Sequence, residues 1–245
     1  MSYREGIDFK LEELEQQSYE GVDLSGHKTD DLNTMWRNTL EAGMHGICFS
    51  LYEDGQEPGD TITVSQVERR IMILKPFTKW IRSFSCIEGN EHIPRLAKKH
   101  GLQTMVGAWL GDDDKKNKQE IKALIELANE GNVDIAAVGN EVLYRNDLSL
   151  DELIDYMKEV RSAIPAHIPI GYVDAYYEFS SHPELVEHSD VILSNCYPFW
   201  EGCPEEYALP HMQSMYGQAM DAAKGKKVII TETGWPSKGE NLNGA

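Results

Sequence analysis

Two hydrophobic patterns alternate along most of this chain. Seven short apolar runs, rich in β-branched residues, have the length expected of buried strands. They occupy residues 46–51, 78–84, 102–109, 133–138, 168–173, 191–195 and 228–231. Other segments carry apolar residues three and four positions apart, which predicts helices. The expected helices are residues 32–41, 64–75, 91–100, 115–130, 150–163, 183–187 and 207–224.

The helix expected at residues 150–163 has the clearest end signal. Ser149 is a helix-capping residue type, and Glu152 stands three positions later, the spacing of a capping box. The first-turn charges of Asp151 and Glu152 also suit the positive end of the helix dipole. We therefore expect this helix to begin at residue 150.

The helix expected at residues 32–41 stands before the first strand. Asp30 and Asp31 are expected to cap it, and Gly43 is expected to end it. Its apolar residues fall on one face: Leu32, Met35, Trp36 and Leu40.

The alternation of strands and helices predicts an α/β fold with a parallel sheet, either doubly wound or closed into a barrel. A nucleotide-binding sheet has little support, because no glycine-rich G-x-G-x-x-G motif follows the first strand. Polar residues of types that could serve in catalysis or binding recur at the ends of many strands, which favours the (β/α)8 TIM barrel.

One unit of such a barrel is missing from the count. We find seven strand–helix steps where eight are needed, and only thirteen residues follow Glu232. We expect a barrel without its eighth strand–helix unit, with an open seam between the first and seventh strands. Residues 1–30 are polar and lack periodicity, so they are interpreted as an N-terminal extension, the one spare segment that could cover the seam. Residues 31–245 are then a C-terminally incomplete barrel domain.

Composition narrows the possible partners. The net charge of −18 disfavours nucleic acid, an anionic membrane surface and acidic polysaccharides, whereas a neutral glycan remains compatible. No run of about eighteen apolar residues is present, so no membrane span is expected. Residues 1–20 show no signal peptide, so the protein is intracellular unless a leader has been removed. We expect a monomer.

The four cysteines do not identify the compartment. Cys48, Cys86 and Cys196 lie in or just after apolar runs, where buried thiols are common. Cys196 and Cys203 are close enough for a loop disulfide, which stays an alternative. No metal-ligand spacing such as C-x-x-C or H-E-x-x-H is present, so no metal or cofactor is expected.

Two apolar runs deliver a carboxylate at their carboxyl ends. Val228-Ile229-Ile230, expected to be buried on both faces, leads to Glu232, and the run at residues 133–138 leads to Glu141. Either could be an ordinary solvated side chain at a strand end. In a parallel barrel, however, these ends converge on one face, where paired carboxylates suit acetal hydrolysis.

The segments around these carboxylates are specific. VGNE at residues 138–141 and ITETGWPS at residues 230–237 resemble glycoside hydrolase family 17, the β-1,3-glucanases and β-1,3-glucanosyltransferases. The resemblance extends roughly over residues 43–237. It implies that Glu141 is the acid/base and that Glu232 is the nucleophile of a retaining glycosidase acting on neutral β-glucan.

Three polar residues are expected beside this pair. Asn140 fits a donor to the sugar 2-hydroxyl, although it could merely turn the strand end. By the resemblance to the wider clan, Tyr197 hydrogen-bonds the nucleophile, unless it is a core tyrosine. Arg82 ends the second strand, where a cation would lower the pKa of a nearby nucleophile, but it could instead form a helix-facing ion pair.

Aromatic residues are the candidates for stacking on sugar rings. The family resemblance places the loop containing Tyr52, Asp54 and Gln56 near the non-reducing-end subsites. Asp174 could bond sugar hydroxyls or cap the next segment. Each aromatic candidate could equally be structural packing, and the set comprises Trp235, Trp200, Phe199, Tyr52, Trp109 and Tyr176.

The expected mechanism has two geometric consequences. A retaining pair of carboxyl groups stands ~5–5.5 Å apart, and Arg82 or Tyr197 should reach Glu232. The pKa of Glu141 should be raised beside a second carboxylate. A glucanosyltransferase would use the same residues, and a glucan-binding barrel without turnover is a rival of another class. An aldolase is disfavoured because no strand run ends in lysine.

Overall fold

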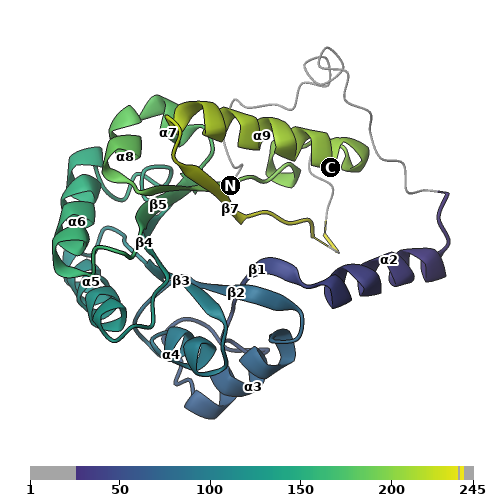
Figure 1. The fold of residues 1–245 in the computed structure, drawn as a ribbon, viewed down its shortest axis with the longest axis horizontal. Coiled ribbons are helices and arrows are strands. Elements are labelled where there is room, and N and C mark those ends of the chain that lie inside the picture. The colour runs from purple at the N-terminus through teal and green to yellow at the C-terminus, as the bar shows by residue number, and fades with distance from the viewer. Residues whose placement is uncertain (1–25, 237, 240–245) are drawn as a thin grey trace.

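The computed structural model describes residues 26–236, 238 and 239. Seven strands form one parallel sheet in the order β1 to β7, each paired with the next along the chain. Figure 1 shows the helices surrounding this sheet as it curves into a nearly closed barrel. The predicted TIM-type barrel with seven strands is confirmed. The strands are β1 (Met44–Cys48), β2 (Thr78–Ser83), β3 (Gln103–Ala108), β4 (Ile135–Asn140), β5 (Ile170–Ala175), β6 (Val191–Asn195) and β7 (Lys227–Glu232).

The long helices occupy the predicted places to within a few residues. Those predicted from periodicity are α2 (Thr29–Ala42), α3 (Val64–Leu74), α4 (His92–Lys99), α5 (Asp114–Asn129), α6 (Leu150–Ala163), α8 (Pro183–His188) and α9 (Ala208–Ala222). Three one-turn elements were not predicted, because they are too short to show a period. They are α7 (Glu178–Ser181), η1 (Phe199–Glu201) and η2 (Glu205–Tyr207).

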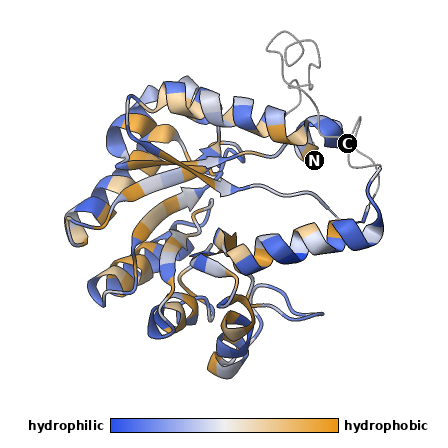
Figure 2. Ribbon diagram, turned by 45° about the vertical axis from the view of Figure 1, so that its right-hand side comes forward, coloured by the Kyte–Doolittle hydropathy of each residue, from blue (hydrophilic) through white to orange (hydrophobic). Residues whose placement is uncertain are grey.

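Helix α6 illustrates how sequence determines an element here. The Ser149 side chain accepts from the Glu152 backbone N–H, and the Glu152 carboxylate accepts from the Ser149 N–H, so the predicted capping box is present. The apolar stripe of α6 includes Leu153 and Met157, which are fully buried in the main core between the helices and the sheet. Figure 2 shows this arrangement as hydrophobic strands enclosed by helices with polar outer faces.

Helix α2 differs from expectation in two respects. Its N-cap is Lys28, whereas Asp30 and Asp31 lie in the first turn, and no side chain makes a capping hydrogen bond. Its apolar face is not buried: none of its residues is buried, and Trp36 is 64% exposed. Figures 1 and 2 show α2 extending away from the helices that cover the barrel. Gly43 ends the helix, as predicted.

The seam between β1 and β7 is open. Within the described residues these two strands share no backbone pairing, although the Cys48 thiol donates to the Thr231 carbonyl at 3.2 Å. A cavity of about 530 Å³, lined by residues of both strands, opens there. The expectation that β7 is buried on both faces is therefore wrong. Val228 is buried, but Ile229 and Ile230 are only partly so, because no further strand among the described residues covers that side.

The N-terminal expectations fall mostly outside the described part of the chain. Residues 1–25 of the expected extension, and their possible role over the seam, lie there. The expected boundary between residues 30 and 31 falls within the first turn of α2.

All four cysteines are thiols rather than disulfides. Cys86, Cys196 and Cys203 are buried, but Cys48 is exposed, contrary to expectation, because it lies on the seam strand β1.

Candidate active site

A bulge near the end of β4 aims Glu141. The register between β4 and β5 shifts between Ala137 and Asn140, and Gly139 lies within the shift with φ +84°. A β-carbon at Gly139 would lie 3.3 Å from side-chain atoms of Leu153 and Tyr172, so glycine suits both the conformation and the space. The strand thus turns out of its ladder just before Asn140 and Glu141.

A second irregularity lies at the end of β7. Ser194 of β6 pairs with Ile230, but the next residue, Asn195, pairs with Glu232, so Thr231 is passed over. The Cys196 N–H donates to the Glu232 carbonyl at 2.9 Å and fixes the strand end. Both candidate carboxylates therefore follow a break in register at the carboxyl end of the sheet, where the sequence predicted that they would meet.

Arg82, from the end of β2, bridges the two candidate motifs. Its Nη1 lies 2.5 Å from Glu232 Oε1, and its Nη2 donates to Asn140 Oδ1 at 2.6 Å. Arg82 is almost fully buried, and its guanidinium lies 4.3 Å from the Phe84 ring centroid. A planar fork can serve two acceptors in this way. Arg82 therefore does not form the alternative ion pair that would face a helix.

Tyr197 holds the other oxygen of the same carboxylate. Its hydroxyl donates to Glu232 Oε2 at 2.9 Å. Burial, and then the charge of Glu232, raise the pKa of Tyr197, so the phenol keeps its proton as a donor. The prediction that Arg82 or Tyr197 reaches Glu232 is confirmed, and both do.

Asn195 is the partner of Glu141, and sequence reasoning missed it. Its Nδ2 donates to Glu141 Oε1 at 2.8 Å, while its Oδ1 accepts from Thr231 Oγ1 at 2.8 Å. The Thr231 hydroxyl thereby fixes which end of the amide faces Glu141. The sequence did hold a signal, because Asn195 ends an apolar run. The structure buries this side chain fully, and a buried polar side chain needs a hydrogen-bond partner.

Burial is the main cause of the raised pKa of Glu141. The charge of Glu232 adds to the effect, whereas the Asn195 hydrogen bond and the positive charges of Arg145 and Arg82 oppose it. The expected direction is confirmed, but desolvation outweighs the carboxylate pair that we expected as the cause. A carboxyl group in this environment holds its proton to higher pH than an exposed one.

The aromatic candidates fall into three groups. Trp235 and Trp200 are 38% and 45% exposed, and the buried Phe199 packs edge-on against both at centroid distances of 5.4 and 5.0 Å. Tyr52 and Trp109 line a separate cavity of about 280 Å³. Tyr176 is buried, so it does not present a face for stacking.

The acidic candidates outside the pair have different settings. Asp54 is exposed in the turn after β1. Asp174 is fully buried and accepts from the Tyr172 hydroxyl and the Ala175 N–H. Burial raises the pKa of Asp174 to about 8. Asp174 therefore has neither suggested role, binding sugar hydroxyls or capping the next segment, because it accepts hydrogen bonds inside the protein.

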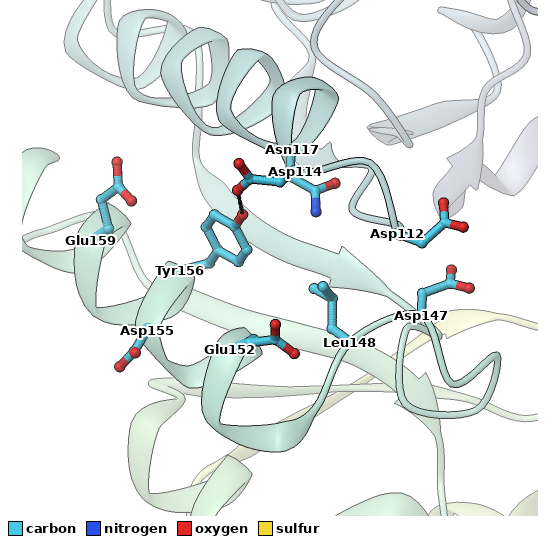
Figure 3. A pocket seen from close by; sticks show the side chains of 9 residues that line it. All are labelled: Asp112, Asp114, Asn117, Asp147, Leu148, Glu152, Asp155, Tyr156 and Glu159. Carbon is cyan, nitrogen blue, oxygen red and sulfur yellow. Dashed lines mark hydrogen bonds between the residues drawn. The ribbon is translucent and has the colours of Figure 1, made fainter.

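A hollow of about 330 Å³ between α5 and α6 gathers six carboxylates. Figure 3 shows them around Tyr156, whose hydroxyl bonds Asp114. Asp114 also pairs with Lys118, Asp147 pairs with Arg145, and Glu152 belongs to the capping box of α6. In the described part of the chain no group of His, Cys, Asp and Glu side chains suits a metal ion.

A membrane-crossing helix is likewise not found among residues 26–236: none there is both long and apolar enough.

Comparisons with known proteins agree on one group. A family model described as the BtgE/BtgC glycoside hydrolase domain matches residues 46–245. Glucan 1,3-beta-glucosidase BGL2 of Candida albicans is 26% identical over 83% of this chain and 73% of its own length. A probable glucan endo-1,3-beta-glucosidase, btgC of Aspergillus flavus, is 29% identical, and the chain spans only 28% of it.

One solved fold is also similar. The glycoside hydrolase family 17 β-1,3-glucanosyltransferase of Rhizomucor miehei is 30% identical over 83% of this chain and 76% of that one, with a TM-score of 0.74. An active-site mutant of the same enzyme was solved in complex with laminaritriose.

Proposed function

The chain belongs to the BtgE/BtgC glycoside hydrolase domain family, and from this premise we propose that it cleaves β-1,3-glucan by a retaining double displacement. The observation that carries the proposal is the different environment of two carboxylates at the carboxyl ends of β4 and β7. Glu232 accepts from a cation and a phenol, whereas Glu141 is partly buried and accepts from a neutral amide. Unequal environments of this kind separate a nucleophile from an acid.

Glu232 is the proposed nucleophile. Arg82 and Tyr197 each bond one of its oxygens, which fixes the plane of the carboxylate. An oxygen of Glu232 attacks the anomeric carbon, and the bond from that carbon to the leaving oxygen breaks. Retaining enzymes need the two carboxyl groups ~5–5.5 Å apart, and we expect that separation for Glu141 and Glu232.

Glu141 is the proposed acid and then base. Its raised pKa keeps the proton that the leaving oxygen receives in the first step. In the second step an acceptor hydroxyl gives its proton to Glu141 and attacks the anomeric carbon, which releases Glu232. Asn140, whose Oδ1 is engaged by Arg82, has its amide nitrogen to donate to the sugar 2-hydroxyl.

The substrate is proposed to be a neutral β-1,3-glucan, bound by a monomer. The acidic surface of the chain disfavours anionic glycans, and laminaritriose, the ligand of the Rhizomucor miehei mutant, is such a neutral oligosaccharide. Trp235 with Phe199 on one side, and Tyr52 with Asp54 on the other, are the proposed subsite residues. Residues 31–245 are the proposed catalytic domain.

Transfer to a second sugar is the other candidate reaction. The specific observation in its favour is the likeness to a glucanosyltransferase, whereas the curated relatives are named as glucosidases. Hydrolysis and transfer share the first step and differ only in the acceptor. Products longer than the donor at high laminari-oligosaccharide concentration would identify a transferase, and only shorter products would identify a hydrolase.

Replacing each carboxylate tests the mechanism. We expect Glu232→Gln and Glu141→Gln each to lower turnover of a laminari-oligosaccharide by at least ~10³-fold while binding persists. On an aryl β-glucoside with a good leaving group, Glu141→Gln should still form the glycosyl-enzyme, because that leaving group needs little protonation. Substantial turnover by Glu232→Gln, or binding without turnover in the unmodified protein, would contradict the proposal.

A further inference from the structure

The backbone of Glu141 is in an unusual conformation. Its φ is +52°, in the left-handed region that residues other than glycine rarely adopt. Such a conformation is strained and persists only where surrounding contacts enforce it. The contacts that hold Glu141 there therefore decide where its side chain points.

Arg145 supplies two of those contacts. Its Nη1 donates to the carbonyl of Asn140 at 2.5 Å, and its backbone N–H donates to the carbonyl of Glu141 at 2.9 Å. The remaining group, the Glu141 N–H, donates to the carbonyl of Val173 on β5 at 2.8 Å. The peptide carbonyls on both sides of the Glu141 α-carbon are thus held by a single residue four positions later.

The same guanidinium ties this turn to the loop after β3. Nη2 of Arg145 donates to the Leu110 carbonyl at 2.9 Å, and Nε pairs with Asp147 at 2.7 Å. The Trp109 ring, after β3, lies 4.7 Å from the guanidinium carbon, and this indole is 37% exposed. Each of the three guanidinium nitrogens thus donates to a group that frames the end of β4 or the loop after β3.

We propose that Arg145 is a positioning residue that holds Glu141 in its strained backbone conformation and so aims its carboxyl group at the leaving oxygen. The inference rests on the proposed role of Glu141 as acid/base. Arg145 acts through the backbone rather than by touching the Glu141 carboxylate or the sugar. Proton transfer depends steeply on this aim, since a displacement of about 1 Å can cost about 10²-fold in rate.

The chain offers a matched control in Arg161. This arginine also donates to two backbone carbonyls, of Ile168 and Pro165, and pairs with one carboxylate, Asp190. Its side chain is about as exposed as that of Arg145. It lies before β5, at the end of the barrel opposite the carboxylates. Its loss should therefore affect folding but not proton transfer.

The test compares two substrates in the full chain. Arg145→Gln, Arg145→Lys and Arg161→Gln are assayed on laminaripentaose and on a dinitrophenyl β-laminaribioside. We expect Arg145→Gln to lower kcat/KM on laminaripentaose by about 10²-fold, while the initial burst of dinitrophenol keeps its rate within about threefold. Arg145→Lys retains a donor for one carbonyl and should recover part of the loss. Arg161→Gln should leave both rates unchanged.

Each outcome decides the matter. Equal losses on both substrates, or no loss on laminaripentaose, would overturn the role of Arg145. If Arg145→Gln fails to fold, Arg145→Lys alone decides: a loss confined to laminaripentaose supports the proposal, and any other pattern contradicts it. Failure of the proposed function is recognised separately, because Glu141→Gln would then keep its activity on laminaripentaose.

Discussion

The carboxyl group of Glu120 is buried completely, although it lies outside the proposed catalytic pair. From α5 it accepts from the Ser85 hydroxyl at 2.5 Å and from the Cys86 N–H at 2.7 Å, which anchors the loop after β2. Burial raises the pKa of Glu120 from 4.5 to about 7, because the hydrogen bonds only partly offset desolvation. This loop also contains Phe84, the ring beneath Arg82.

Glu120 should make the stability of the protein depend on pH near neutrality. Between pH 4.5 and 7 the folded protein holds a proton that the unfolded chain has released, so the free energy of unfolding should fall as pH rises. The contribution of Glu120 to this fall should be on the order of 3 kcal/mol across that window, and Glu120→Gln should lack that contribution. Urea unfolding at pH 4.5 to 8.5 measures it.

Two comparisons sharpen that measurement. Asp174, with its pKa raised to about 8, should cause a fall at least as large in both proteins, and that fall should extend to higher pH. Glu130 pairs with Arg95, which lowers its pKa, so Glu130→Gln should not flatten the profile. An unchanged slope in Glu120→Gln would show that this carboxyl is not the titrating group.

At the scale of elements, the ends of β4 and β7 matter more than their lengths. Each strand breaks register just before its carboxylate, and the β4 break depends on Gly139 at φ +84°. Regular strands would alternate side chains across the sheet without a turn at their ends. The two irregularities direct the polar groups at the ends of β4 and β7 toward their partners on other strands.

Replacing Gly139 should damage stability and activity together. Gly139→Ala is expected to cost about 1–3 kcal/mol, because the new β-carbon meets Leu153 and Tyr172 in a backbone region that alanine avoids. We also expect slower turnover of laminari-oligosaccharides, since the bulge aims Glu141. Thermal unfolding and steady-state kinetics measure the two effects.

Gly217 provides the matched substitution. It lies inside α9 with no atom within 4 Å of an added β-carbon, so Gly217→Ala should stabilise the protein by about 0.5–1 kcal/mol and leave turnover unchanged. If Gly139→Ala behaved in the same way, the bulge would not require glycine.

At the scale of the whole molecule, the barrel is not held equally around its circumference. β4 and β5 are each paired on both edges, whereas β1 and β7 each have one paired edge and face a cavity of about 530 Å³. Glu232 stands at the end of β7, so one proposed catalytic residue belongs to the less supported side. The Arg82–Glu232 ion pair links β2, on one side of the open seam, to β7 on the other side, at the carboxyl end of the barrel.

Amide hydrogen exchange should reveal this difference. We expect amides of β1 and β7 to exchange more than about tenfold faster than those of β4 and β5, after correction for intrinsic rates, because strands at an open edge need less of the fold to open. The central strands are the internal control. Equal protection of β1 and β4 would mean that another segment closes the seam.

Much of the fold follows from the sequence. The bounds of α6 and β6 match the predicted ranges, because an apolar period and a cap are local properties of the chain. The two carboxylates were also found from sequence, because each follows an apolar run within a specific motif. Burial was predicted less well, as Ile229 and Trp36 show: their exposure depends on which neighbours are present rather than on their own segments.

Tertiary structure alone decided which polar atoms meet. The contact of Asn195 with Glu141 joins residues 54 positions apart, and the Arg82–Glu232 pair joins residues 150 positions apart. No local pattern encodes such a pair, because curvature of the sheet brings the strand ends together and register breaks set their directions. Hydrophobic periodicity therefore determined the elements and the face on which the chemistry lies. The curvature of the sheet and its register breaks determined the partners of each carboxylate, since hydrogen bonds depend on distances of a few ångströms that only packing can set.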